Sequence, residues 1–481
     1  MVTFIIGFFI LGYLFIALEH VLKIDKGSSA LITGAVCWTC VALGGSEFAS
    51  FFDERLTDKI SSYIINPEYH DFVKYELGHH LKEIGEILFF LLGAMTIVEL
   101  IDSHKGFKII TDRITTRSRI GLLWVLCIVA FFFSAVLDNL TAAIVMGALL
   151  TKLFRKKQDL WFFGGMIIIA ANAGGAWSPI GDVTTIMLWI GKQVTAANII
   201  TSIIIPSVVC MIVPLIIVSL TMKRNQKLDL IEEVKNSKNE ITTVFERNLI
   251  FCLGVLGLLF VPVFKIITHL PPYTGMLFSL GILWLVTEVL HKNKPYEIKS
   301  KLIVSGVVRK IDMPTIFFFL GILLAVSSLA SIGVLNKVAI FLENTFSGDI
   351  IIINIIIGLL SAIIDNVPLV AGAMQMYEVG PVGPLSYPQD HAFWEFLAYC
   401  AGTGGSVLII GSAAGVAIMG ILKIDFLWYL RKIAFLALIG YLSGALCYWV
   451  LNKNELSNQK QTTEIEIENQ IGERSKYICK L

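Results

Sequence analysis

The sequence predicts an all-α polytopic membrane protein in which each half has about five transmembrane helices, one re-entrant hairpin and one broken helix. Three observations lead to this prediction. Of the 481 residues, 56% are hydrophobic and 16% are charged, whereas charged residues form about a quarter of a soluble domain. Long apolar runs, which are typical of bilayer-crossing helices, recur from Met1 to Val450. Several short motifs also occur twice, in the same order along the chain.

The rest of the composition excludes several classes of function. The formal net charge of +1 gives no indication of a nucleic-acid partner. The eight cysteines are scattered without metal-ligand spacing, and we expect packing residues and no cofactor. The chain shows no nucleophile–base set or nucleotide-binding motif, so we expect no enzyme. The apolar run Val2–Val21 lacks the basic start and small-residue cleavage site of a signal peptide and is expected to span the membrane.

In the first half, the sequence predicts spanning helices that are interrupted by two unusual stretches. Ordinary spans are expected at Val2–Val21, Ser28–Gly44, Leu81–Ile101 and Ile199–Leu220. The stretch Ile120–Thr151 has only about a dozen residues after Asn139, too few to cross a hydrocarbon core of about 30 Å. Basic residues bound it on both sides, which predicts that both of its ends are cytoplasmic. We therefore predict a re-entrant hairpin with Asp138 and Asn139 at its tip.

The second unusual stretch, Trp161–Gly191, is too long for one straight span, because at 1.5 Å per residue it would reach about 46 Å. Its middle contains four residues that interrupt helices, Gly174, Gly175, Pro179 and Gly181. Unwound backbone at membrane depth is tolerated only where protein or a cavity surrounds it. The sequence therefore predicts a broken helix at an internal site.

The same order of apolar runs and motifs occurs again after a polar, basic linker. Spans are expected at Asn248–Ile267, Tyr273–Leu290 and Ile433–Leu451, and Phe393–Leu422 is again too long for one simple span. Four motifs of the first half return 227 to 230 residues later: Phe317–Gly321 after Phe89–Gly93, Asp365-Asn366 after Asp138-Asn139, Gly404-Gly405 after Gly174-Gly175, and Gly411 after Gly181. Constant order and nearly constant offset indicate an internal repeat.

The expected organisation is a first repeat at 1–221, a cytoplasmic linker at 222–247, a second repeat at 248–451 and a polar tail at 452–481. Five crossings in each half is an odd number, so the halves should have inverted topology, the usual build of a secondary transporter. The loop Glu378–His391 has no Lys or Arg, so the second hairpin should enter from outside. Both termini then fall outside, unless Glu47–Tyr75 contains a further helix.

Four motifs carry a resemblance to a known family: Phe132–Thr141, Ala171–Asp182, Ser361–Pro368 and Gly402–Ser406. Asp-Asn hairpin tips combined with Gly-Gly-broken helices resemble the NhaD-type sodium/proton antiporters of the ion transporter superfamily. Sister families, the dicarboxylate and citrate carriers, have Ser-Asn-Thr tips. Here Asp138 and Asp365 stand near those serine positions, which favours a cation over an anion. The resemblance implies a scaffold domain and a moving transport domain, often in a homodimer.

We expect twelve polar residues from these motifs to line one cavity near the midplane. They are Asp138, Asn139, Thr141, Asn172, Ser178, Asp182, Thr184, Asp365, Asn366, Thr403, Ser406 and Ser412. Carboxylate, amide and hydroxyl oxygens suit a hard cation such as sodium, which we place at Asp138 and Asp365. Because clustered buried acids cannot all ionise cheaply, sodium (or lithium) and protons would compete for them. Glu99 is either a proton relay or a side chain that reaches the interface.

The predicted function is therefore exchange of sodium or lithium for protons, with small inorganic cations and the lipid bilayer as partners. The expected location is a bacterial inner (cell) membrane, and pH homeostasis is the expected role. One alternative is an anion carrier for arsenite or a di- or tricarboxylate, which would need a neutral or positive, hydroxyl-rich site. A membrane enzyme or passive channel is a further alternative, but the inverted repeat is not typical of a simple pore.

Overall fold

The computed structural model describes residues 1–17, 19–44, 69–111, 116, 118–222, 241–381, 383 and 385–453. Within these residues, nine helices are long and apolar enough to cross a membrane. Ala413–Leu422 and Phe426–Lys432 meet the same criteria only as a pair, and they are bent by 116°. The predicted class, an all-α polytopic membrane protein, is therefore confirmed.

The first half contains α1 (Val2–Ala17), α2 (Glu19–Leu22), α3 (Lys26–Leu43), α6 (Tyr69–Ser103), α7 (Lys108–Thr111), α8 (Arg119–Leu137), α9 (Asn139–Leu153), α10 (Lys157–Ala176), α11 (Val183–Ile190) and α12 (Ala196–Thr221). The second begins with α13 (Val244–Thr268), α14 (Pro272–Leu290), α15 (Tyr296–Leu302), α16 (Val304–Val307), α17 (Met313–Ser331) and α18 (Val334–Phe346). It continues with α19 (Ile350–Leu360), α20 (Asn366–Met376), α21 (Ala392–Gly404), α22 (Ala413–Leu422), α23 (Phe426–Lys432) and α24 (Ala434–Leu451). Between α20 and α21, strands β1 (Glu378–Val379) and β2 (Ser386–Tyr387) pair in parallel, with Glu378 opposite Ser386.

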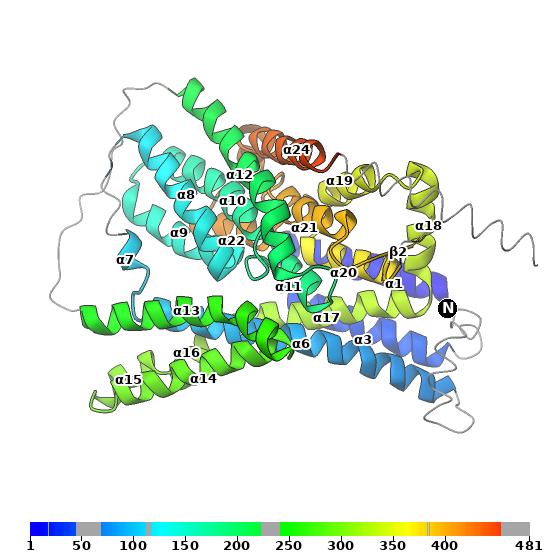
Figure 1. Ribbon diagram of the computed structural model, residues 1–481, viewed down its shortest axis with the longest axis horizontal. Helices are drawn as coiled ribbons and strands as arrows, with labels where there is room; N and C mark the ends of the chain where they lie inside the picture. Colours follow the sequence, from blue (N-terminus) through cyan, green and yellow to red (C-terminus); the bar gives the residue numbers. More distant parts are fainter. Residues whose placement is uncertain are drawn as a thin grey trace, which may run out of the picture.

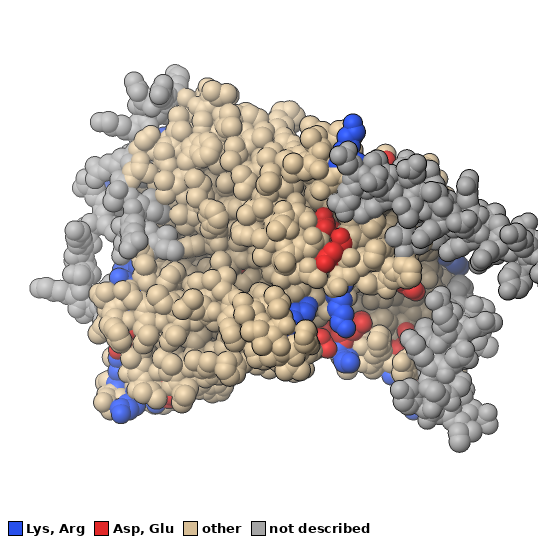
Figure 2. All heavy atoms as spheres, viewed as in Figure 1, with Lys and Arg blue, Asp and Glu red and all other residues tan. Residues whose placement is uncertain are grey.

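Two layers of helices are visible in Figure 1. The lower layer holds α3, α6, α13, α14 and α17, which run along the long axis of the molecule and pack against one another. The upper layer holds α8 to α12 and α19 to α24, which include both predicted hairpins and both predicted broken helices. On the face shown in Figure 2, much of the surface carries no Lys, Arg, Asp or Glu, as expected for a surface facing lipid.

Small residues bring α3 and α17 of the lower layer into backbone contact. A Cβ added at Gly321 would lie 2.3 Å from the carbonyl carbon of Ala30, and one added at Gly34 would lie 2.6 Å from the Gly321 carbonyl oxygen. Close approach through small residues is how membrane helices gain packing energy in the absence of a hydrophobic driving force. The α3 and α17 helices are therefore closely packed against each other.

The first predicted hairpin is present as α8 and α9, which are separated only by Asp138. Arg119 at the start of α8 pairs with Asp159 in the first turn of α10, at 2.5 Å. Since α10 begins soon after α9 ends, the start of α8 and the end of α9 lie together, and the chain turns back at Asp138.

The second hairpin consists of α19 and α20, with the turn Ser361–Asp365 between them. Early in α19, Asn354 donates to the Phe393 carbonyl oxygen at 3.2 Å. The Tyr377 ring, just past α20, lies 4.5 Å from the Phe393 ring. The open end of this hairpin is thus near the start of α21.

Matching hydrogen bonds occur at corresponding positions of the two halves. Ser134 in α8 donates its hydroxyl to the Ala171 carbonyl oxygen at 2.5 Å. Ser361, which is 227 residues later, donates in the same way to Ala401 at 2.8 Å. Each hairpin is therefore bonded to the broken helix of its own half. The opposite membrane orientation of the halves and the four domain limits stay predictions.

Some boundaries differ from those expected. Helix α6 runs from Tyr69 to Ser103 rather than from Leu81 to Ile101, because polar residues continue the helix beyond the hydrocarbon length. Helix α13 begins at Val244, inside the predicted linker, because Thr243 and Glu246 form a capping box there. The amphipathic helix α18 was not predicted. Most of the linker, the tail beyond residue 453 and residues 45–68, where a further helix was considered, lie outside the described residues.

Candidate functional site

The first hairpin tip, Asp138, caps the helix that follows it. Its backbone has a φ of 79°, in a region that residues other than glycine rarely adopt. Its two carboxylate oxygens accept hydrogen bonds from the backbone N–H and the hydroxyl of Thr141, at 2.7 and 3.0 Å. Asp138 is half-buried, and both of its oxygens are engaged by the next turn of its own chain.

The second tip has the same acid but not the same cap. Asp365 precedes α20 without a capping hydrogen bond, and the position that corresponds to Thr141 is Pro368, which has no N–H to donate. One oxygen of Asp365 is buried without any hydrogen-bond partner among the described residues. The other lies 3.7 Å from the ammonium nitrogen of Lys26, at the start of α3.

The two tips meet at Asp182, in the break between α10 and α11. Asp182 is only 1% exposed. Its Oδ2 accepts a 2.5 Å hydrogen bond from the Asn139 amide and a 3.2 Å bond from the Asn366 amide. Its Oδ1 accepts from the backbone N–H and the hydroxyl of Thr184, both at 2.9 Å. A single carboxylate therefore holds both hairpins to the broken helix.

The second broken helix joins this network through Asn172. The amide nitrogen of Asn172 donates to the hydroxyl oxygens of Ser406 and Ser412, at 2.9 and 2.8 Å. Its carbonyl oxygen accepts from the Asn139 amide at 3.2 Å. Because Ser406 and Ser412 flank the break between α21 and α22, these bonds link both broken helices to the first tip.

Three of the predicted site residues make their hydrogen bonds elsewhere. Ser178 donates to the Ala135 carbonyl oxygen at 2.5 Å, and Thr403 donates to the Tyr399 carbonyl oxygen at 2.6 Å. Both hydroxyls are buried. Because each one donates its proton, its oxygen lone pairs can still act as acceptors. Glu99 is farther away, in the last turn of α6, where it pairs with Lys310 at 3.3 Å and accepts a bond from Ser103. Its partners are thus at the end of the lower layer.

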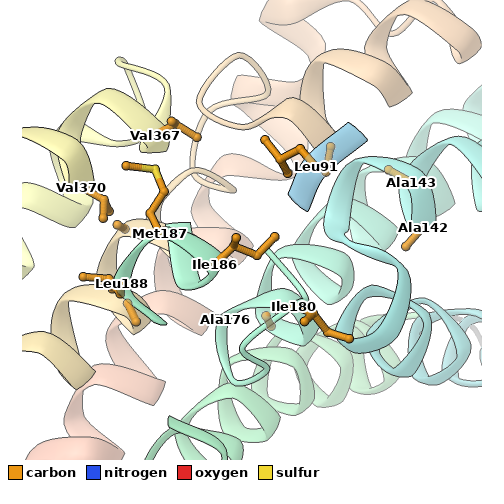
Figure 3. Close-up of a cluster of buried hydrophobic side chains, with 14 of the residues drawn as sticks. Leu91, Ala142, Ala143, Ala176, Ile180, Ile186, Met187, Leu188, Val367 and Val370 are labelled. Carbon is orange, nitrogen blue, oxygen red and sulfur yellow. The ribbon is translucent and has the colours of Figure 1, made fainter. Parts of the chain in front are cut away.

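The elements that carry the polar network also bury apolar side chains. Figure 3 shows Ala142 and Ala143 of α9, Ile180 of the first break, Ile186 to Leu188 of α11, and Val367 and Val370 of α20, gathered around the chain segments that meet there. All of these side chains are buried. Since hydrogen bonds and charges are stronger in a low-dielectric surrounding, the acids are costly to leave without a cation or proton.

Two cavities are lined in part by helices that carry the site. One of about 570 Å³ lies between α9, α22 and the starts of α3 and α17, and Lys26, Asp25 and Asp312 are among its lining residues. Another of about 350 Å³ lies between α6, α11, α17 and α20, with His80 and Glu83 in its wall. The larger of these two cavities thus reaches Lys26, the ion-pair partner of Asp365 at the second tip.

Lys26 is a candidate site residue that the sequence did not reveal. In the sequence it is one of two lysines, with Lys23, in a short turn between two apolar runs. Its partner Asp365 lies more than 300 residues away along the chain, and no local pattern indicates such a pair. The twelve predicted residues themselves remain candidates.

Hairpin tips and broken helices that meet at buried acids and amides are the arrangement of a secondary transporter. The chain belongs to the citrate transporter family, whose model matches residues 13–394. It is 43% identical over 438 residues to sodium/proton antiporter 1 of Arabidopsis thaliana, covering 91% of this chain and 70% of that protein. Identity to sodium/proton antiporter 2 of the same plant is 40% over 443 residues, covering 91% and 97%. The Na⁺/H⁺ antiporter NhaD of Vibrio cholerae is 27% identical over 472 residues, covering 92% and 90%.

Proposed function

We propose that this membrane protein exchanges sodium or lithium for protons, and that the ions compete for the carboxylates of Asp138, Asp182 and Asp365. The observation that carries the proposal is the position of Asp182, a buried acid that holds both tips through the amides of Asn139 and Asn366. Among the described residues, Asp138 and Asp182 form no ion pair with a basic side chain. A cation or a proton is therefore the natural partner of these two acids.

Repulsion between the acids gives a reason for exchange. The Asp182 carboxylate lies close enough to those of Asp138 and Asp365 to interact with both charges. Three negative charges in one apolar enclosure are unfavourable, so the cation-free site should hold at least one proton. Binding of a hard cation, with oxygens as ligands, would then release that proton. Which acid carries the proton is left open.

A carrier of citrate or another anion is the second candidate, because the matching family model is described as a citrate transporter. A tricarboxylate would bring negative charge to a site that already contains three acids. Among the described residues, Lys26 is the one basic side chain that forms an ion pair with any of the twelve residues predicted to line the cavity, and its partner is Asp365. The chemistry of the site therefore favours a cation.

Purified protein in liposomes with a trapped pH-sensitive dye would test the proposal. Sodium, lithium, potassium, citrate and arsenite gradients would be applied in turn to matched vesicles. We expect sodium or lithium to drive proton movement and citrate and arsenite to have no effect. Movement of protons or charge with citrate but not with sodium would establish the alternative.

We also propose that the two hairpins enter the membrane from opposite faces, with the first opening to the cytoplasm. The bias of basic residues supports this orientation. A single cysteine at Arg155 should react only with a cytoplasmic thiol reagent, and one at Gln389 only with an external reagent. Labelling of both positions from one face would contradict the inverted topology.

A further inference from the structure

The ion pair between Lys26 and Asp365 connects the two layers of the molecule. Lys26 is the first residue of α3, in the lower layer, and Asp365 is the tip of the second hairpin, in the upper layer. The ammonium nitrogen lies 3.7 Å from the carboxylate, and the side chains are 18% and 15% exposed. Because both groups are mostly removed from water, each needs the other's charge when no further ion is present.

The helix position of Lys26 is unfavourable for a positive charge. A lysine in the first turn of a helix faces the positive end of the helix dipole. The start of α3 is also held firmly, because a Cβ at Gly27 would lie 2.8 Å from the Pro314 carbonyl oxygen of α17. The ammonium sits 4.5 Å from the centre of the Phe318 ring, so its stem follows the α17 surface toward the tip.

Asp365 has a carboxylate oxygen that is available to another partner. One of its oxygens is buried without a hydrogen bond, and the hydroxyl of Tyr13, close enough to interact with the Asp365 charge, also has no partner among the described residues. Lys26 lines the cavity of about 570 Å³, which gives its side chain room to move away from the carboxylate. The pair therefore has unused ligand atoms and free space beside it.

We propose that Lys26 is a tethered cation that occupies the Asp365 carboxylate in the sodium-free protein and is displaced when sodium binds. This inference rests on the proposed function. Lys26 acts through Asp365 and is thus a positioning residue that sets the apparent affinity for sodium. A constant ion pair that only holds the layers together would not compete with sodium, and the two roles predict different results.

Lys26→Gln removes the competitor while keeping a long polar side chain. We expect the sodium concentration that gives half-maximal exchange to fall about tenfold, corresponding to about 1.4 kcal/mol, while the maximal rate changes less. Lys26→Arg keeps the charge and supplies a fork that can hold a carboxylate with two hydrogen bonds. That variant should fold and should shift half-saturation the opposite way, to severalfold higher sodium. Lys23→Gln, an exposed charge change in the same turn, is the matched control and should leave half-saturation unchanged.

The measurement is sodium-driven proton movement in liposomes, with a sodium titration for each variant. Wild-type protein without sodium-driven movement would overturn the proposed function and this inference with it. Wild-type exchange with the same half-saturation in Lys26→Gln and Lys26→Arg as in wild type would overturn the Lys26 inference alone. If Lys26→Gln fails to fold, unchanged or lower half-saturation in Lys26→Arg is sufficient to reject it.

Discussion

The two hairpin tips share a Ser-Ala-x-x-Asp-Asn sequence but place their acids in different surroundings. At the first tip, Thr141 occupies both oxygens of Asp138 with local hydrogen bonds. At the second, Pro368 offers no N–H, and Asp365 has a lysine from another helix and one oxygen without a hydrogen-bond partner in the described part of the chain. Both halves therefore have the acid, but the residue three positions later is Thr141 in the first half and Pro368 in the second. This difference changes what the acid can bind. Asp138 is held by its own helix, and Asp365 is open to an exchangeable cation.

The contact between hairpin arm and broken helix differs much less than the tips do. A Cβ at Gly174 would lie 2.1 Å from the Phe131 carbonyl oxygen, and one at Gly404 would lie 2.0 Å from the Gly358 carbonyl oxygen. In each half the first glycine of the pair thus allows the broken helix to touch the hairpin arm. This contact is therefore equivalent in the two halves, whereas the tips differ in backbone as well as in side chains, with a φ of 79° at Asp138 and −48° at Asp365.

The largest effect is expected where the tips meet. Asp182→Asn should abolish exchange, because it removes the charge that accepts two amide hydrogen bonds, each worth about 1.5–3 kcal/mol. The new amide nitrogen would also face other donors. Sodium-driven proton movement in liposomes is the measurement, and Asp159→Asn, which neutralises an acid paired with Arg119 at the far end of α8, is the control. Normal exchange by Asp182→Asn would show that the tips work independently of this acid.

Neutralising each tip separately sharpens the comparison. Asp138→Asn and Asp365→Asn should each severely weaken cation-driven proton movement while the protein stays folded, because both acids are needed for the cation. Asn caps a helix about as well as Asp, so a purely capping role predicts normal transport by Asp138→Asn. No capping explanation is available for Asp365, which caps nothing. If both purified variants exchange sodium normally, the cation site lies elsewhere.

Exchanging Thr141 and Pro368 should change how strongly the acid of each tip is capped. Pro368→Thr supplies an N–H and a hydroxyl to Asp365, each bond being worth about 1 kcal/mol, and half-saturation should move about fivefold or more toward higher sodium. Thr141→Pro should release Asp138 and remain folded, since proline is tolerated in a first helical turn. Sodium titration of both variants provides the test. Unchanged half-saturation in Pro368→Thr would mean that capping does not compete with cation binding.

The smallest effect is expected from Thr141→Val. It removes the hydroxyl bond to Asp138 but keeps the backbone N–H bond, so the loss of stability should be about 1 kcal/mol. Thermal unfolding of the purified protein should show a small decrease, with exchange reduced only a few-fold. Thr151→Val, an exposed position near the end of α9, is the matched control. A loss of exchange as large as that of Asp138→Asn would indicate that the hydroxyl itself binds the ion.

Much of the site could be predicted because local sequence determines local backbone. The Asp-Asn pairs were found at hairpin turns and the Gly-Gly pairs at helix breaks, since short arms, glycines and prolines restrict the chain wherever they occur. The role of Asp182 as the common acceptor was not evident, because its repeat partner is Ser412. Ser178 and Thr403 were grouped with the other polar residues, yet their hydroxyls bond to nearby carbonyl oxygens.

The sequence by itself determined the membrane class, the internal repeat and the two acidic tips, since apolar length, glycine breaks and motif spacing act within one segment. Only the tertiary structure decided which atoms meet: Asn139 and Asn366 at Asp182, and Lys26 at Asp365. These contacts join segments up to several hundred residues apart. They depend on how tightly helices pack through residues such as Gly321 and Gly34, and no single segment contains that information.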